Sequence, residues 1–145
     1  MEASVWIRPW EREDITQLAV LSGELGYAAT AEQVAHRLAQ IGPNGTVLVA
    51  ADRKSDVVLG WIELQAITHL TSDPHLEICG LVVSAAARSR GIGSLLVAAA
   101  EKTAIERKIA FLRVRSNIIR DRTHGFYERL GFANVKTSKV FEKAL

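Results

Sequence analysis

Cysteine is nearly absent from the sequence, since Cys79 is the only one among 145 residues. A single cysteine cannot form an internal disulfide, and a cysteine-rich metal site is excluded as well. The four histidines, at positions 36, 69, 75 and 124, lack the spacing of a metal-binding pair. We therefore expect no metal, a fold held together by its apolar core, and a reducing compartment.

Long apolar runs and runs of basic residues are absent too. No apolar stretch reaches the roughly 18 residues that a membrane-spanning helix needs, and the N-terminal stretch MEASVWIRPWERED has no basic region followed by an apolar one. The formal net charge is +2, with the basic residues scattered along the chain, which suits a small phosphorylated ligand better than a nucleic acid. We expect a cytoplasmic protein with neither a membrane nor a nucleic-acid partner. The sequence is compatible with a monomer and with a homodimer.

The chain also lacks internal repeats, low-complexity segments and linkers rich in glycine, serine or proline. Its length is that of one ordinary domain, and 48% of its residues are hydrophobic, as in a folded protein with a packed core. We therefore expect a single domain over residues 1–145.

Hydrophobic periodicity predicts an α/β fold with a mixed, mostly antiparallel sheet. Alternating or β-branched segments predict strands, and apolar residues at helical spacing between capping signals, such as the Thr30 and Gln33 pair, predict helices. The expected strands are 4–8, 46–51, 57–68, 75–84, 109–115 and 134–141, and the expected helices are 11–25, 30–41, 91–107 and a short one around 126–130. The order is β-α-α-β-β-β-α-β-α-β. Because one helix connects the fourth and fifth strands, these two are expected to be parallel neighbours.

A glycine-rich turn, ARSRGIGS at 87–94, lies between an apolar strand and the clearest helix. A Walker loop is excluded because no Lys-Ser or Lys-Thr follows the glycines, and a dinucleotide fingerprint would need a third glycine where Leu96 stands. The remaining pattern, Arg-x-x-Gly-x-Gly, can hold a pyrophosphate, because the glycines admit the anion to the backbone and the first helical N–H groups point at it. The alternative is a helix start whose glycines serve close packing alone.

This turn, the preceding strand LEICGLVV and the later segment FYERLGF resemble the GNAT superfamily of acyl-CoA-dependent N-acyltransferases. The resemblance covers essentially the whole chain. It implies a three-layer, GNAT-like fold in which the parallel fourth and fifth strands splay apart to admit the acyl group. We expect the bulge that begins this splay at Gly80.

The resemblance further implies acetyl-CoA as the co-substrate, held at two places. The turn would bind the pyrophosphate, and backbone groups of the strand before it would contact the pantetheine arm. Many members carry an asparagine where this chain has Arg120, and Asn117 is the candidate for the missing contact. The residues assigned to coenzyme A are Leu81, Val82, Val83, Arg88, Ser89, Arg90, Gly91, Ile92, Gly93, Ser94, Asn117 and Tyr127.

Acetyl transfer from a thioester to an amine requires a neutral amine, a stabilised oxyanion and a proton for the departing thiolate. Tyr127 matches the family tyrosine that protonates the sulfur; the alternative is an aromatic side chain that only packs against its neighbours. Glu77 stands where some members carry a glutamate that removes the amine proton, often through water. The alternative for Glu77 is a carboxylate on the open side of the sheet or one paired with an arginine. A backbone N–H near Val82 is the expected oxyanion donor.

The acceptor is expected to bind between the loop that carries Tyr27 and the strand that carries Trp61 and Glu63, beside a loop bracketed by His69 and His75. Aromatic and acidic groups suit a small cationic amine. We therefore expect an enzyme that transfers an acetyl group to a primary amine of a small molecule. The alternatives are acetylation of a protein or peptide, and an acyl-CoA-binding domain without catalysis.

Overall fold

Residues 4–116 and 121–145 are described by the structure, which is a computed structural model. The chain divides into two compact units, Met1–Val114 and Arg115–Leu145. The first contains a sheet and three helices, and the second contains one helix followed by a segment without regular structure. Of the residues assigned from the sequence, Asn117 lies outside the described residues.

Five strands form one sheet in chain order, β1-β2-β3-β4-β5. Neighbouring strands from β1 to β4 are antiparallel and β4 and β5 are parallel, which confirms the expected mixed sheet. The strands span Val5–Pro9, Gly45–Asp52, Val58–His69, Ser72–Val83 and Phe111–Val114.

The last of these strands, β5, begins later than predicted. Lys108 has a φ of 58° and the N–H of Ile109 donates to the carbonyl of Ala104 at 2.9 Å. Both features are typical of the turn that ends a helix. The residues just before β5 therefore complete the preceding helix end instead of extending the strand.

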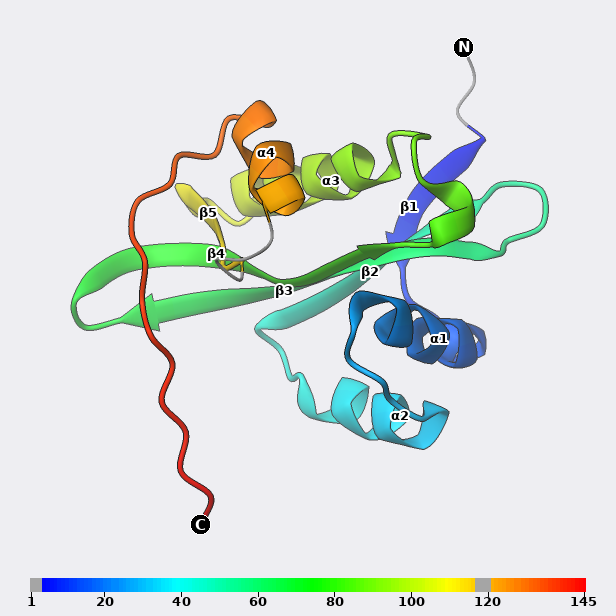
Figure 1. The fold of residues 1–145 in the computed structure, drawn as a ribbon, viewed down its shortest axis with the longest axis horizontal. Coiled ribbons are helices and arrows are strands. Elements are labelled where there is room, and N and C mark those ends of the chain that lie inside the picture. The colour runs from blue at the N-terminus through cyan, green and yellow to red at the C-terminus, as the bar shows by residue number, and fades with distance from the viewer. Residues whose placement is uncertain (1–3, 117–120) are drawn as a thin grey trace. The chain divides into compact units, whose positions relative to one another are not determined.

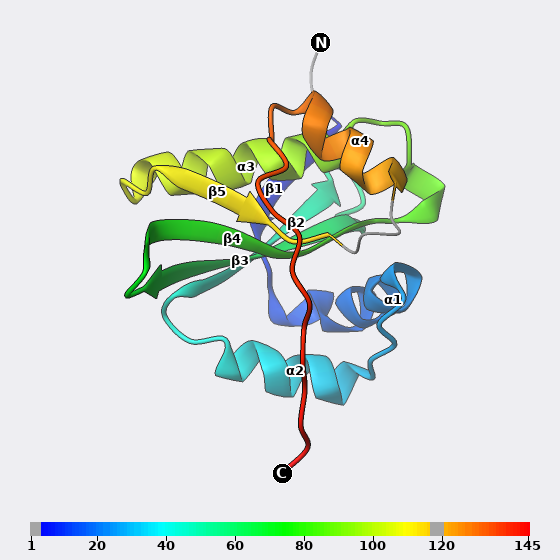
Figure 2. The ribbon, with the colours of Figure 1, turned by 60° about the vertical axis from the view of Figure 1, so that its left-hand side comes forward.

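Helices cover both faces of this sheet (Figure 1). On one face lie α1 (Ile15–Leu25), preceded by a 3-10 turn at Arg12–Asp14, and α2 (Ala31–Gln40); on the other lies α3 (Ile92–Glu106). A second view shows the same arrangement (Figure 2). The first unit is therefore built in the three layers that the sequence predicts.

Local sequence signals set the ends of α1 and α2. Thr30 Oγ1 accepts from the N–H of Gln33 at 3.1 Å, and Gln33 Oε1 accepts from the N–H of Thr30 at 3.0 Å, which confirms the predicted capping box. Gly26, with a φ of 104°, ends α1 in the left-handed conformation. On the face that these helices cover, Leu18 and Leu21 pack with the strand residues Val49 and Val82.

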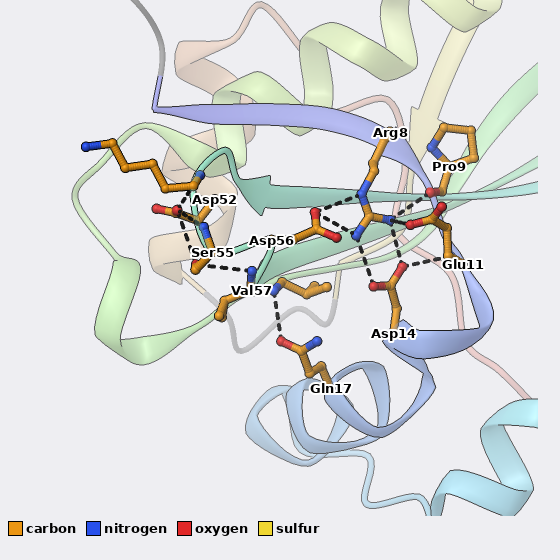
Figure 3. A network of polar contacts seen from close by, with 11 residues as sticks. Arg8, Pro9, Glu11, Asp14, Gln17, Asp52, Ser55, Asp56 and Val57 are labelled. Atoms are coloured by element: carbon orange, nitrogen blue, oxygen red, sulfur yellow. Dashed lines mark hydrogen bonds and ion pairs between the residues drawn. The ribbon is translucent and has the colours of Figure 1, made fainter.

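A buried ion pair ties β1 to the start of α1 (Figure 3). The guanidinium of Arg8, which is 7% exposed, donates to both carboxylate oxygens of Asp14, at 2.8 and 3.0 Å. It also donates to Asp56 of the β2–β3 turn at 3.2 Å. Burial by itself would raise the pKa of Asp14, but hydrogen bonds from Arg8 and from the N–H of Glu11 hold that pKa below its usual value. We assign this network a structural role.

The second unit is built around α4 (Asp121–Arg129). Tyr127 is buried and makes edge-to-face contacts with Phe126 and Phe132, with ring centroids 5.1 and 5.3 Å apart. Gly131, with a φ of 92°, turns the chain just past the helix, as predicted.

The prediction of a strand at 134–141 is wrong. Residues 132–145 contain neither helix nor strand. A strand persists through hydrogen bonds to a neighbouring strand, and the described part of the chain provides this segment with no such pairing. Val135 and Val140 are 76% and 89% exposed. Their β-branched side chains carry a propensity for strand, but propensity does not supply a pairing partner.

Candidate active site

The edge of β4 is open over its second half. β5 pairs with β4 only from His75, opposite Phe111, to Ile78, opposite Val114. Beyond that point residues 79–83 have no strand beside them on this edge among the residues that the structure describes. The parallel pair therefore parts here, as predicted, and leaves backbone N–H and C=O groups without strand partners.

A β-bulge marks the start of the open edge. Glu63 of β3 pairs with Gly80, but the next residue, Leu64, pairs with Ile78, so Cys79 is an extra residue in β4. A bulge bends its strand and increases the local twist. The extra residue directly precedes Gly80, where the sequence predicts the bulge, and it follows the last residue of β4 that pairs with β5.

The Trp61 side chain lies against this bulge. A Cβ at Gly80 would be 2.9 Å from the Trp61 ring, closer than side chains tolerate, so only glycine allows the indole to approach the backbone here. Trp61 also packs on the apolar cluster of α1 and the sheet. The indole therefore connects the core to the beginning of the open edge.

Pairing with β3 determines which backbone groups point at the open edge. The N–H of Ser84 donates to the carbonyl of Leu59 at 2.7 Å, and the direction of these groups alternates along an antiparallel pair. The N–H of Val82 therefore points at β3, whereas those of Leu81 and Val83 point at the open edge. The N–H groups that a ligand can reach on this edge are those of Leu81 and Val83.

The glycine-rich turn joins β4 to α3 and leaves the helix N-terminus accessible. Ala87 and Ile92, 2% and 1% exposed, anchor the turn in the core. Between them Ser89 and Gly91 have φ values of 74° and 75°. Gly91 is the N-cap and provides no side-chain acceptor, so the first N–H groups of α3 have no partner within the helix. A Cβ at Gly91 would meet nothing within 4 Å, which leaves the approach to these donors open.

Positive charge surrounds this N-terminus. Arg88 and Arg90 are exposed on the turn, and the helix dipole adds a partial positive charge. Arg90 Nη2 donates to Ser4 Oγ at 3.0 Å, which ties the turn to the residue before β1. Backbone donors, a dipole and two guanidinium groups together suit an anion with several oxygens.

Glu77 lies on β4 just before the bulge, opposite Gln65 of β3 and Arg113 of β5. Its side chain is 18% exposed, and its Oε1 lies 3.1 Å from Nε2 of His75, which is only 1% exposed. From the sequence, His75 was expected only to border a loop. The sequence does contain a signal for this contact. His75 and Glu77 are two positions apart, and residues at this spacing in a strand have their side chains on the same face.

The surroundings of Glu77 disfavour a further negative charge. Burial raises the pKa of the Glu63 carboxyl on β3. Burial, followed by the charges of Glu63 and Glu77, raises the pKa of the Cys79 thiol to about 11. The thiol therefore stays protonated at neutral pH and is not a nucleophile. The same negative potential favours a cation near these residues.

Tyr127 belongs to the second unit. Its side chain is 7% exposed, and burial raises the pKa of its phenol to about 12. The phenol is therefore protonated at neutral pH and able to donate a proton. Glu77 and the coenzyme A residues from Leu81 to Ser94 belong to the first unit, on β4 and on the turn that follows it.

The sequence matches the acetyltransferase (GNAT) family over residues 7–132, which is most of the chain. The chain belongs to this family. It is therefore a GNAT acetyltransferase, and the family uses acetyl-CoA. No curated protein sequence matches the chain.

Solved structures similar to this GNAT acetyltransferase share its fold. A transcriptional regulator from Bacillus halodurans C-125 is 24% identical, with a TM-score of 0.84 over 96% of this chain and 99% of that one. Glucosamine-6-phosphate N-acetyltransferase from Arabidopsis thaliana is 18% identical, with a TM-score of 0.78 over 97% and 100%. Aminoglycoside N-acetyltransferase AAC(6′)-Iy, solved in complex with CoA, is 15% identical, with a TM-score of 0.84 over 97% and 95%.

Within the described residues, this GNAT acetyltransferase has no group of three or more potential metal ligands and no helix long and apolar enough to cross a membrane. A shallow hollow of about 240 Å³ lies near Pro9 at the end of β1, between α2 and the start of β2. The glycine-rich turn reaches the opposite end of β1, at Ser4. The hollow therefore lies away from the glycine-rich turn.

Proposed function

We propose that this acetyltransferase moves the acetyl group of acetyl-CoA to a primary amine of a small molecule. The observation that supports this best is that the open edge of β4 leads directly into the uncapped N-terminus of α3. The edge offers backbone N–H and C=O groups in a line, and the helix start offers converging donors with positive charge. An extended, amide-containing chain that ends in a pyrophosphate matches both.

The first step of the proposal is the binding of coenzyme A. The turn from Arg88 to Ser94 holds the pyrophosphate, and the absence of a Cβ at Gly91 lets the anion reach the backbone donors. The backbone groups of Leu81 and Val83 bond the amides of the pantetheine arm. Val82, between them, keeps this stretch of β4 paired with β3.

The second step is the chemistry at the thioester. Glu77 accepts a proton from the substrate ammonium, directly or through water, and the freed amine nitrogen bonds to the acetyl carbon. A β4 N–H at Leu81 or Val83 stabilises the oxyanion. As the carbon–sulfur bond breaks, Tyr127 gives its proton to the sulfur, and coenzyme A leaves as a thiol. The nitrogen releases its second proton, and the Tyr127 phenolate regains one through solvent, so the product is a neutral amide. The catalytic domain that we propose covers residues 1–145.

The proposed acceptor is a small cationic amine. Glu63 and Glu77 make the region beside the bulge electronegative, and Trp61 provides an apolar wall there. Two of the similar structures are N-acetyltransferases named for amino sugars, glucosamine-6-phosphate and aminoglycosides. An amino sugar or a polyamine therefore forms the first set of acceptors to test.

Thiol release from acetyl-CoA, followed with a thiol-reactive chromophore, tests the proposal. The assay compares amino sugars, polyamines and amino-acid amides with N-acetylated versions of the same compounds and with peptides. We expect release that depends on a free small-molecule amine. Release with peptides alone would indicate a protein or peptide acetyltransferase, and calorimetric binding of acetyl-CoA without release would indicate a binding domain.

A further inference from the structure

The buried contact between His75 and Glu77 goes beyond the roles assigned so far. Both residues lie on β4, two positions apart, and Nε2 of His75 is 3.1 Å from Oε1 of Glu77. His75 is 1% exposed, and its other ring nitrogen, Nδ1, is buried and has no hydrogen-bond partner among the described residues. In this arrangement the imidazole can form a hydrogen bond to Glu77 through Nε2.

The orphaned Nδ1 indicates how the ring is protonated. A carboxylate can only accept, so Nε2 must carry a hydrogen to bond an ionised Glu77. A doubly protonated ring would bury an unpaired N–H at Nδ1, which costs more than an unpaired acceptor there. The contact is therefore best described as a neutral imidazole that donates from Nε2 to the Glu77 carboxylate.

The same atom argues against a relay of protons through the ring. A relay needs a partner at the second nitrogen, and none of the residues that the structure describes bonds Nδ1. The nearest aromatic contact, with His69 of β3, has its ring centroid 6.3 Å away. Within the described part of the chain a proton on His75 has no onward protein partner, so the contact is suited to orienting the carboxylate.

We propose that His75 is the positioning residue of Glu77 and holds its carboxylate in one orientation toward the acceptor amine. The inference rests on the proposed role of Glu77 as the base. Charged and titratable groups near the pair include Arg113 at the paired position of β5, Glu63 on β3 and Cys79 on β4, and the ring of His69 lies beside that of His75. The uncharged Gln65 occupies the paired position on β3. His75 combines nearly complete burial with a direct contact to the carboxylate.

Two polar substitutions of similar size test the geometry. In His75→Gln the side-chain amide nitrogen can reach the place of Nε2, whereas in His75→Asn it reaches only the place of Nδ1. We expect His75→Asn to lower kcat with the acceptor amine by about 10- to 100-fold, since misplacing a catalytic group by about 1 Å costs that much. His75→Gln should retain most of the activity, and calorimetric affinity for acetyl-CoA should be the same in both.

A double-mutant cycle with Glu77→Gln separates positioning from packing. If His75 acts through the carboxylate, His75→Asn should have little further effect on kcat once Glu77→Gln is present. The inference would be overturned if the His75→Asn and His75→Gln variants had the same kcat, whether both kept or both lost activity. Additive losses of kcat in the double-mutant cycle would overturn it as well. Failure of the wild-type protein to release thiol with any amine would refute the proposed function itself, which distinguishes the two outcomes. If His75→Asn does not fold, His75→Ala with added imidazole replaces it, and absence of rescue overturns the inference.

Discussion

Gly91 is the residue whose substitution tests the coenzyme A cradle most directly. Its φ of 75° lies in the left-handed region, where an alanine costs about 1–2 kcal/mol. A Cβ at this position would meet no atom of the free protein within 4 Å, so Gly91→Ala should fold. The methyl group would project into the space through which a pyrophosphate reaches the helix N-terminus. We therefore expect the affinity for acetyl-CoA to fall at least tenfold, about 1.4 kcal/mol.

Gly42 provides the matched control, because its φ of 77° is nearly the same and the nearest atom to an added Cβ is 3.8 Å away. Gly42→Ala should lower the free energy of unfolding by a similar amount without changing acetyl-CoA binding. Thermal unfolding compares the stability of the two variants, and titration calorimetry compares their affinities. Equal acetyl-CoA affinity in Gly91→Ala and wild type would refute the assignment of the turn.

Three further substitutions test other parts of the protein. Tyr127→Phe keeps the aromatic packing but removes the proton donor, so kcat should fall on the order of 100-fold with unchanged acetyl-CoA affinity; full turnover would make the tyrosine structural. In wild type, with its pKa raised to about 12, ionisation of Tyr127 should cause no loss of activity between pH 7 and roughly pH 10. Glu77→Gln cannot accept a proton, so kcat/KM for the amine should fall most at low pH, where the amine is protonated; a uniform loss at every pH would indicate that Glu77 only positions a cation. Arg8→Met would leave Asp14 buried without its cation and should lower the free energy of unfolding at pH 7 by about 3–5 kcal/mol.

The Arg8 contact also predicts how stability depends on pH. The pKa of Asp14 is lower in the folded protein than its usual value, so the folded state favours the ionised carboxylate. The stabilisation is complete above the unfolded pKa and is lost as the pH falls through the folded pKa. Chemical denaturation between pH 6 and 2 should therefore show a loss of stability in wild type that is smaller in Asp14→Asn, and parallel losses would contradict this reasoning.

Features encoded by neighbouring residues could be predicted from the sequence. The capping pair Thr30 and Gln33, the helix-ending Gly26 and the periodicity of the strands each depend on contacts within a few residues, so they indicated helices, strands and their order. The glycine-rich turn at 87–94 was visible for the same reason. Its conformation requires residues that tolerate a positive φ and a helix that begins immediately afterwards.

Other features depend on pairing between distant segments, and only the tertiary structure decided them. Residues 134–141 carry strand propensity, yet no strand forms without a neighbour to pair with. The register of β3 against β4 decides that the N–H groups of Leu81 and Val83, and not that of Val82, point at the open edge. The sequence by itself determined the type and order of most elements and the family, because those follow from local periodicity and short motifs. The tertiary structure decided where β5 leaves β4 and that a buried His75 contacts Glu77. Register and burial are set by contacts between strands that the chain brings together only when it folds.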